Sequence, residues 1–375
     1  MAIELDQSTI SNDKNTNKSI LDKEFTLFEK KTISSKDRIF LFQQIQLLLQ
    51  TGTPLRAGLS ALSKQSDKTA IRDLLQSLID SIDEGKSFSY ALSKFPEVFT
   101  STHVNLISAS EDGGYMDKVL QQIIDMEERR EKLKETMISA ISYPMFLAVF
   151  SFGVVAFILV IVFPKFAELF AKIHEHLPAT TKVLMWVSDG LIHQWPIVIG
   201  CMAAIVISFF YWLKSESGSK QFDKFKLSFP LVKDVFLQVY LVQSLRVMYL
   251  SLSNGVSIVD TLHSCKNTVQ NNIYQEFLMT VENQINEGKG ISHGFSQGKF
   301  VPPLVKQMIS TGEESGNLPV VMGKIADHYE NELMNHLKTL SKLAEPIMLV
   351  LMGAVVGIIV SSLILPIFML SRAVN

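Results

Sequence analysis

Two glutamates that stand beside glycines, Glu111 and Glu313, carry the side chains best suited to chemistry. Each opens a short acidic run that ends in a glycine, at Gly114 and at Gly316. Two carboxylates serve acid–base catalysis or bind a cation when they meet in space. These two are far apart in the chain, and nothing in the sequence brings them together. We therefore expect a loop-defining role at a helix start, where acidic groups are favourable, or a partner-contact surface.

A second recurring motif has the appearance of a phosphate-binding loop. Glu84-Gly85 and Glu287-Gly288 are each followed by a lysine. A phosphate-binding loop needs another glycine five positions before its second glycine, and Asp80 occupies that position. A glycine that ends a helix is the better interpretation. We expect these four residues to define loops or contact a partner, and we expect no catalytic residue, cofactor or metal site.

These motifs belong to a unit that occurs twice. The Glu-Gly-Lys motif returns after 203 residues, and the acidic run that begins at Glu111 returns after 202 residues. The segment 47–52, Leu-Leu-Leu-Gln-Thr-Gly, matches 250–255, again at 203. Repeat periods of solenoids run at roughly 20 to 50 residues, so this long period indicates tandem domains. Helical spacing of apolar residues predicts a helical bundle in each copy, at 36–142 and at 214–343.

Three stretches without Asp, Glu, Lys or Arg reach the length of a membrane span, and we predict transmembrane helices at 143–164, 195–213 and 344–371. About 20 apolar residues cross a bilayer core as a helix. Prolines bound two of the stretches, namely Pro144, Pro164, Pro346 and Pro366. Gly353 and Gly357 form a GxxxG pattern in the last stretch, which favours helix packing. The predicted fold is an all-α membrane protein with two tandem homologous cytoplasmic helical bundles and three transmembrane helices.

The charges beside the stretches predict their direction. Basic residues precede the first stretch and follow the second, whereas lysines between them are offset by acids. Because basic residues stay on the cytoplasmic side, we expect a cytoplasmic N-terminus, a periplasmic segment at 165–194 and a periplasmic C-terminus. Absence of charge inside the stretches disfavours a transporter, which usually carries charged residues along its path. A membrane-embedded enzyme would need a constellation of acids, histidines or serines that the sequence does not offer.

The composition of the chain further restricts its partners and its cellular compartment. The net charge is −2 and the basic residues are dispersed, so we expect no nucleic acid partner. The two cysteines form no CxxC or secreted pattern, which fits soluble parts in a reducing cytoplasm. Residues 1–35 are polar, and we expect a disordered leader there rather than a cleavable signal peptide.

The ordered set of motifs resembles the inner-membrane platform family of type II secretion and type IV pilus machines, the type II secretion F family. The first copy departs from the family pattern at Ser110, where the second copy keeps Gly312. The resemblance covers roughly residues 36 to 371. The segments that carry it are Phe42–Gly52, Pro54-Leu55, Glu84–Phe88, Phe95-Pro96, Ala109–Gly114, Tyr143-Pro144, Val162–Pro164, Leu177-Pro178, Thr180-Thr181, Gly255, Glu287-Gly288, Thr311–Gly316 and Pro346.

The resemblance implies a non-enzymatic, multi-pass protein of the bacterial inner membrane. It implies a hexameric assembly ATPase, pilin or pseudopilin subunits and other inner-membrane assembly proteins as partners, together with the lipid bilayer and further copies of the chain. We expect the client to be a type IV pilus, and a type II secretion pseudopilus or a competence filament are the alternatives. We expect that lysine in place of Glu111 or Glu313 weakens ATPase binding without unfolding the protein.

Overall fold

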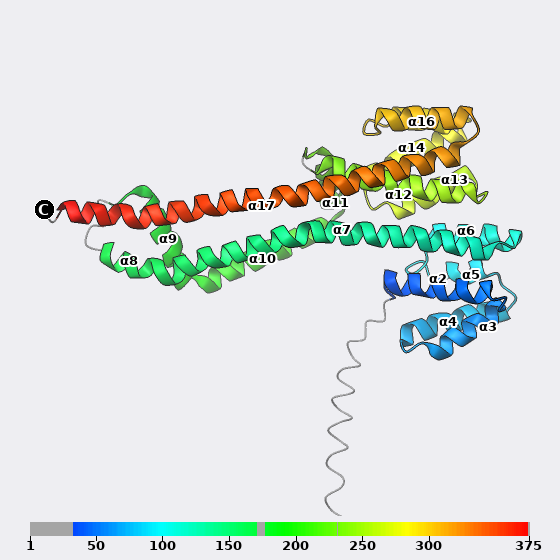
Figure 1. The fold of residues 1–375 in the computed structure, drawn as a ribbon, viewed down its shortest axis with the longest axis horizontal. Helices are drawn as coiled ribbons and strands as arrows, with labels where there is room; N and C mark the ends of the chain where they lie inside the picture. Colours follow the sequence, from blue (N-terminus) through cyan, green and yellow to red (C-terminus); the bar gives the residue numbers. More distant parts are fainter. Residues whose placement is uncertain (1–32, 171–176, 231, 374–375) are drawn as a thin grey trace, which may run out of the picture.

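The computed structural model describes residues 33–170, 177–230 and 232–373, and every regular element in these ranges is a helix (Figure 1). The predicted all-helical class is therefore confirmed. Up to residue 32, the predicted leader lies outside the described residues. The molecule is elongated: two groups of short helices lie at one end, and long helices extend from them to the other end (Figure 1).

The first group of helices, which we call bundle 1, surrounds one apolar core. Phe42, Leu78 and Leu106 are fully buried in it, and so is Ile123 of the long helix α7 (Met116–Phe157). A capping box between Ser34 and Asp37 satisfies free backbone groups at the first helix start. The short helices of bundle 1 are α2 (Ser35–Gln50), α3 (Leu55–Gln65), α4 (Thr69–Asp83), α5 (Phe88–Ser93) and α6 (Ser101–Gly113).

The second group, bundle 2, has its own core. Leu245, Tyr274, Phe295 and Ile309 are fully buried there. Its helices are α12 (Lys233–Ser253), α13 (Ile258–Thr268), α14 (Asn272–Asn286), α15 (Ile291–Gln297), α16 (Pro303–Glu314) and the first part of α17 (Leu318–Ala373).

The order of helices in bundle 2 repeats that in bundle 1, and so do the turns between them. In the part of the chain that the structure describes, six glycines have a positive φ. This left-handed conformation is strained for residues that carry a Cβ atom, so a turn of this shape selects glycine. The six glycines form three pairs at matching places in the two bundles, namely Gly52 and Gly255, Gly85 and Gly288, and Gly114 and Gly316.

Each bundle continues into one very long helix. From bundle 1, α7 (Met116–Phe157) leads through a π-helical segment, η1 (Ile158–Val162), into α8 (Phe163–Phe170). From bundle 2, α17 runs without interruption for 56 residues. At 1.5 Å per residue it spans roughly 84 Å, far more than a bilayer core of about 30 Å.

The four prolines bound apolar runs in the sequence, but none of them ends a helix. Pro144 lies inside α7, and Pro346 and Pro366 lie inside α17. Pro164 is the second residue of α8, which follows the π-helical segment. Because proline cannot donate a backbone hydrogen bond, a wider π turn before it accommodates the missing bond without breaking the helix.

A short helix, α9 (Ala179–His193), connects the far ends of the long helices. The Thr181 hydroxyl donates to the Ser362 carbonyl of α17 at 2.9 Å, and the Ser188 hydroxyl donates to the Leu159 carbonyl in η1 at 2.6 Å. The second bond supplies a partner to a carbonyl in the irregular π segment. Buried backbone groups need such partners, so α9 helps to hold the π segment in place.

Within the described residues, four helices are long and apolar enough to cross a membrane, one more than the sequence predicts. They are residues 116–166, α10 (Trp195–Lys214), α12 and residues 318–368. Within α12, 72% of the apolar window is buried inside bundle 2, against 17%, 0% and 11% in the other three. The side chains of α12 therefore face protein, whereas those of the other three are open to their surroundings.

Candidate functional site

The turns that carry the repeated motifs gather at one end of the molecule. In bundle 1, α2 and α7 are antiparallel, because Lys36 at the start of α2 pairs with Glu135, whereas Gln46 near its end contacts Gln121. Figure 1 shows the C-terminal ends of α2, α6 and α16 on the side of the bundles that points away from α8 and α9. We call this end the distal face; its turns are residues 51–54, 84–87, 113–115, 254–257, 287–290 and 315–317.

Glu111 and Glu313 each bind the start of a short helix. The Glu111 carboxylate accepts hydrogen bonds from the backbone N–H groups of Phe88 and Ser89, the second at 3.1 Å. In bundle 2, the Glu313 carboxylate accepts from Ile291 N at 2.7 Å and from Ser292 N at 3.0 Å. Both carboxylates thus satisfy free N–H groups and the positive end of a helix dipole.

The two carboxylates therefore lie in separate bundles, and each of them caps the start of a short helix in its own bundle. This geometry also argues against the expectation that lysine in place of Glu111 or Glu313 leaves the fold intact, since the substitution removes a capping anion. Gly290 adds to this arrangement, because a Cβ atom there would lie 2.4 Å from the Glu313 carboxylate. In bundle 1 the equivalent position is Ser87, so Glu111 caps its helix start beside a residue that carries a Cβ atom.

The glycines of the motifs shape the turns, and two glutamates beside them face solvent. Gly85 and Gly288 have φ values of 76° and 80°, and each lies two residues after the end of a helix, α4 and α14 respectively. Glu84 and Glu287 are exposed at these helix ends. The Lys289 ammonium lies 2.8 Å from Glu287 and holds the pKa of that carboxyl below its usual value. Exposed carboxylates on the distal face are thus available for contact with a partner.

A buried ionic cluster in bundle 1 was not found by sequence reasoning. The Arg38 guanidinium of α2 donates to the Glu127 carboxylate of α7, and it also donates to the Val98 carbonyl at 3.1 Å. His103 of α6 lies 3.3 Å from the other carboxylate oxygen. The Thr100 N–H donates to His103 Nδ1, which leaves Nε2 to carry the proton that faces Glu127.

Charge and burial act in opposite senses within this cluster. Burial lowers the pKa of His103, so the imidazole is neutral at pH 7. Burial by itself would raise the pKa of Glu127, but His103 and Arg38 outweigh it and lower the pKa to about 2. The charged pair of Arg38 and Glu127 therefore persists in the core.

The second copy has no such cluster. The positions equivalent to Arg38, His103 and Glu127 hold apolar or aromatic side chains, which are all buried in the core of bundle 2, namely Leu241, Val305 and Tyr329. No short motif marks the cluster, because its three members come from three different helices. The mismatch between the two copies is the one signal in the sequence that points to it.

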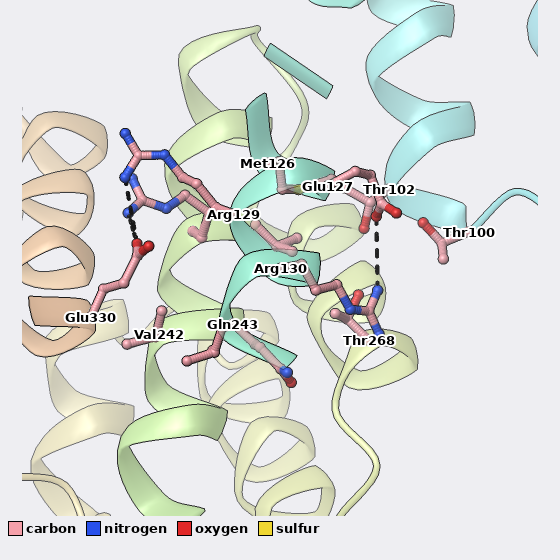
Figure 2. Close-up of a pocket in the computed structure, with 13 residues that line it drawn as sticks. Thr100, Thr102, Met126, Glu127, Arg129, Arg130, Val242, Gln243, Thr268 and Glu330 are labelled. Carbon is pink, nitrogen blue, oxygen red and sulfur yellow. Dashed lines mark hydrogen bonds and ion pairs between the residues drawn. The ribbon is translucent and has the colours of Figure 1, made fainter. Parts of the chain in front are cut away.

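The two bundles contact each other through α7, α12 and α17. Arg246 of α12 binds Asp327 and Glu330 of α17 at 2.7 and 2.6 Å, and Arg129 of α7 lies 3.5 Å from Glu330. Figure 2 shows Glu330 facing Arg129 beside a cavity of about 50 Å³ that also receives Glu127 from the buried cluster. These contacts fix the bundles side by side.

The distal ends of the bundles are also joined. The Asn254 amide donates to the Gln122 side chain at 2.7 Å, and the Tyr115 hydroxyl lies 3.5 Å from the Asn254 carbonyl. Within the described ranges, no three His, Cys, Asp or Glu side chains lie close enough to hold a metal ion. The distal face and the contact between bundles are thus the surfaces that this geometry offers.

The GxxxG glycines lie on α17, far from both bundles. A Cβ atom at Gly353 or Gly357 would meet no other atom within 4 Å. Among the described residues, therefore, neither glycine packs against a second helix.

Comparison with known proteins identifies the family. The sequence model for type II secretion system (T2SS), protein F, matches residues 41–164 and again residues 244–366. The chain is 31% identical to the type IV pilus assembly protein PilC of Myxococcus xanthus, over 96% of this chain and 86% of that protein. It is 30% identical to PilC of Thermus thermophilus, over 89% and 82% of the two chains. It is 28% identical to type II secretion system protein F of Vibrio cholerae, over 92% and 85%. The chain therefore belongs to the type II secretion system protein F family.

Proposed function

We propose that this protein is the inner-membrane platform of a type IV pilus assembly machine, in which it couples a cytoplasmic assembly ATPase to the insertion of pilins. The observation that carries the proposal is the family match in both halves of the chain, together with relatives named as pilus assembly proteins. A platform of a type II secretion system is the second candidate, because other relatives are named type II secretion system protein F.

The proposed topology has three transmembrane helices, which lie in α7 with η1, in α10 and in α17. α12 is excluded because its apolar side chains form the core of bundle 2, so a lipid environment would unfold that bundle. The bundles and the N-terminus lie in the cytoplasm, and residues 165–194 and the C-terminus lie in the periplasm, since basic residues flank the cytoplasmic ends. A phosphatase fused after residue 373 will be active only if this direction holds, and an inactive fusion with normal membrane insertion contradicts it.

The distal face is the proposed docking surface for the hexameric ATPase. Glu84 and Glu287 are the contact candidates, because they are exposed at equivalent turns, whereas Glu111 and Glu313 are occupied as helix caps. Two rigid bundles that continue into membrane helices can transmit a movement of the ATPase to the bilayer. The helices α8 and α9 at the far end face the pilins in this arrangement.

Charge reversal tests the docking surface. Glu84→Lys combined with Glu287→Lys will reduce co-purification of the assembly ATPase, since both changes place a cation on the distal face. The matched control is Glu97→Lys, which changes an exposed glutamate near the opposite end of bundle 1. Equal recovery of the ATPase with all variants contradicts this surface.

Deletion of the gene separates the two candidate machines. Loss of surface filaments by electron microscopy with normal protein release identifies a pilus platform. Loss of protein release with intact filaments identifies a secretion platform.

Contact between copies is proposed at Gly353 and Gly357, because this small-residue face of α17 has no neighbour within the described chain. Isoleucine at both positions will reduce cross-linking between copies in membranes. Unchanged cross-linking rules out this face.

A further inference from the structure

The structure defines the level at which the long helices leave the bundles. In α7, exposed apolar side chains begin at Ile138 and Ile141, and in α17 a run of them begins at Leu340 and Leu343. The Ser341 hydroxyl donates to the Ala140 carbonyl at 3.2 Å, so these positions of the two helices lie side by side. Trp212, at the end of α10, is 40% exposed and is followed by Lys214. Aromatic and basic residues favour this position at the surface of a membrane.

α11 (Glu216–Ser228) starts two residues after α10 ends and is held firmly at this level. A Cβ atom on Gly218 would lie 1.8 Å from the Trp212 carbonyl oxygen, so α11 packs closely on the end of α10. The ring of Phe222 makes an edge contact with Phe209 of α10. On the other side, buried Asp223 accepts a hydrogen bond from Asn272 N of α14 at 3.0 Å. The helix therefore joins α10 to bundle 2.

The outward face of α11 combines cations with aromatic rings. Lys224 is exposed, and Phe225 and Phe229 are exposed by 52% and 41% and stack at 5.1 Å between ring centroids. Lys214 and Lys233, before and after the helix, are exposed too. No carboxylate of the described residues forms an ion pair with these three lysines.

The local charge balance is positive as well. Five lysines and two acidic residues lie between residues 214 and 233. One of the two acids, Asp223, is buried and already pairs with Lys226 at 3.2 Å. An amphipathic helix with lysines and aromatic rings on its open face fits the anionic surface of a bilayer.

We propose that the outward face of α11, together with Lys214 and Lys233, binds the headgroups of anionic phospholipids. The lysine ammonium groups contact the lipid phosphates, and the Phe225–Phe229 pair lies among the upper acyl carbons. The lipids hold bundle 2 against the membrane and set its orientation. The proposal rests on α10 as a membrane span, and it does not depend on the ATPase or on the client filament.

Trp212 supplies a reporter next to the site. The full chain with Trp186→Phe and Trp195→Phe keeps one tryptophan, which brominated lipids quench on contact. Vesicles of phosphatidylcholine receive the same mole fraction of either brominated phosphatidylglycerol or brominated phosphatidylcholine. We expect stronger quenching by the anionic lipid, and we expect 0.5 M NaCl to reduce the difference.

Two substitutions test the lysines. Lys214→Gln with Lys224→Gln will lower the relative association of phosphatidylglycerol by about fivefold for each lysine removed. Lys324→Gln, an exposed lysine of α17 in bundle 2, is the matched control and leaves the preference unchanged.

Equal quenching by the two brominated lipids overturns the lipid site and leaves α10 as a span. Quenching by neither lipid overturns both the site and the span. Loss of the preference in the Lys324→Gln control also overturns the site, because the effect then reflects total charge. Since the assay contains no ATPase and no pilin, failure of the platform proposal is read separately, from the filament and secretion phenotypes.

Discussion

Glutamine in place of Glu127 will destabilise bundle 1 by about 3 to 5 kcal/mol. The Glu127 side chain is 2% exposed and the Arg38 side chain is 11% exposed. Removal of one partner leaves a buried guanidinium without its counter-charge, and this loss costs about that much free energy. The free energy of unfolding of a domain is about 5 to 15 kcal/mol, so the substitution removes a large share of the stability of the bundle.

Hydrogen exchange on the full chain in detergent micelles measures this effect locally. A chain with two bundles and membrane helices does not unfold in two states, whereas amide exchange reports each helix by itself. We expect faster exchange in α2 and α6, and little change in α14 and α15 of bundle 2. The control is Glu135→Gln, which removes an exposed ion pair with Lys36 between the same two helices, α2 and α7. Exposed ion pairs contribute little to stability, so amide exchange in the Glu135→Gln variant will match that of the parent chain.

The second copy provides a further test of the same reasoning. A triple variant of bundle 1 with Arg38→Leu, His103→Val and Glu127→Tyr introduces the residues of bundle 2. Apolar replacement of a whole buried ionic cluster is often neutral or stabilising, so this variant will regain most of the lost protection. The argument is refuted if amide exchange in bundle 1 of the Glu127→Gln variant is no faster than in the parent chain. It is also refuted if this exchange equals that of the triple variant.

Three other predictions concern pH and the repeated turns. Acid will destabilise bundle 1: the folded chain holds the pKa of His103 below 6.5 and that of Glu127 at about 2, so the unfolded chain binds more protons. Exchange in α6, corrected for its intrinsic pH dependence, should accelerate as pH falls below 6.5 and again below 4.5, and pH-independent protection contradicts this. Gly288→Ala will cost about 1 to 2 kcal/mol because the φ of Gly288 is 80°, whereas the helical Gly200→Ala will not. Equal amide exchange at the end of α14 in the two variants refutes the strain. Glu313→Gln will cost about 1 to 2 kcal/mol through its weakened cap on α15, and unchanged exchange of Ile291 and Ser292 amides shows that the cap is dispensable.

Local signals in the sequence were sufficient for much of the fold. The all-helical class followed from the spacing of apolar residues, and the paired turns followed from glycines such as Gly85 and Gly288. A left-handed backbone conformation is a property of one residue and its neighbours, so sequence alone can report it. Apolar length likewise marked α7, α10 and α17 as membrane candidates, because it depends on composition along a single helix.

Other features depended on groups that are distant in the chain. Glu111 and Glu313 bind helix starts more than twenty residues earlier, and no local pattern specifies that pairing. Arg38, His103 and Glu127 meet only because three helices pack together. The prolines suggested boundaries, yet α17 continues through Pro346, since a helix can tolerate proline where packing and neighbouring turns compensate.

By itself, the sequence determined that the chain is helical, that it is duplicated, and where its apolar runs and glycine turns lie. These properties arise from single residues and from periodicity along one helix. Only the tertiary structure decided that the glutamates act as caps, that Arg38, His103 and Glu127 meet in a core, and that α11 turns Lys224 outward at the end of α10. Each of these outcomes depends on which surfaces become buried when the helices pack, and burial is a property of the whole fold.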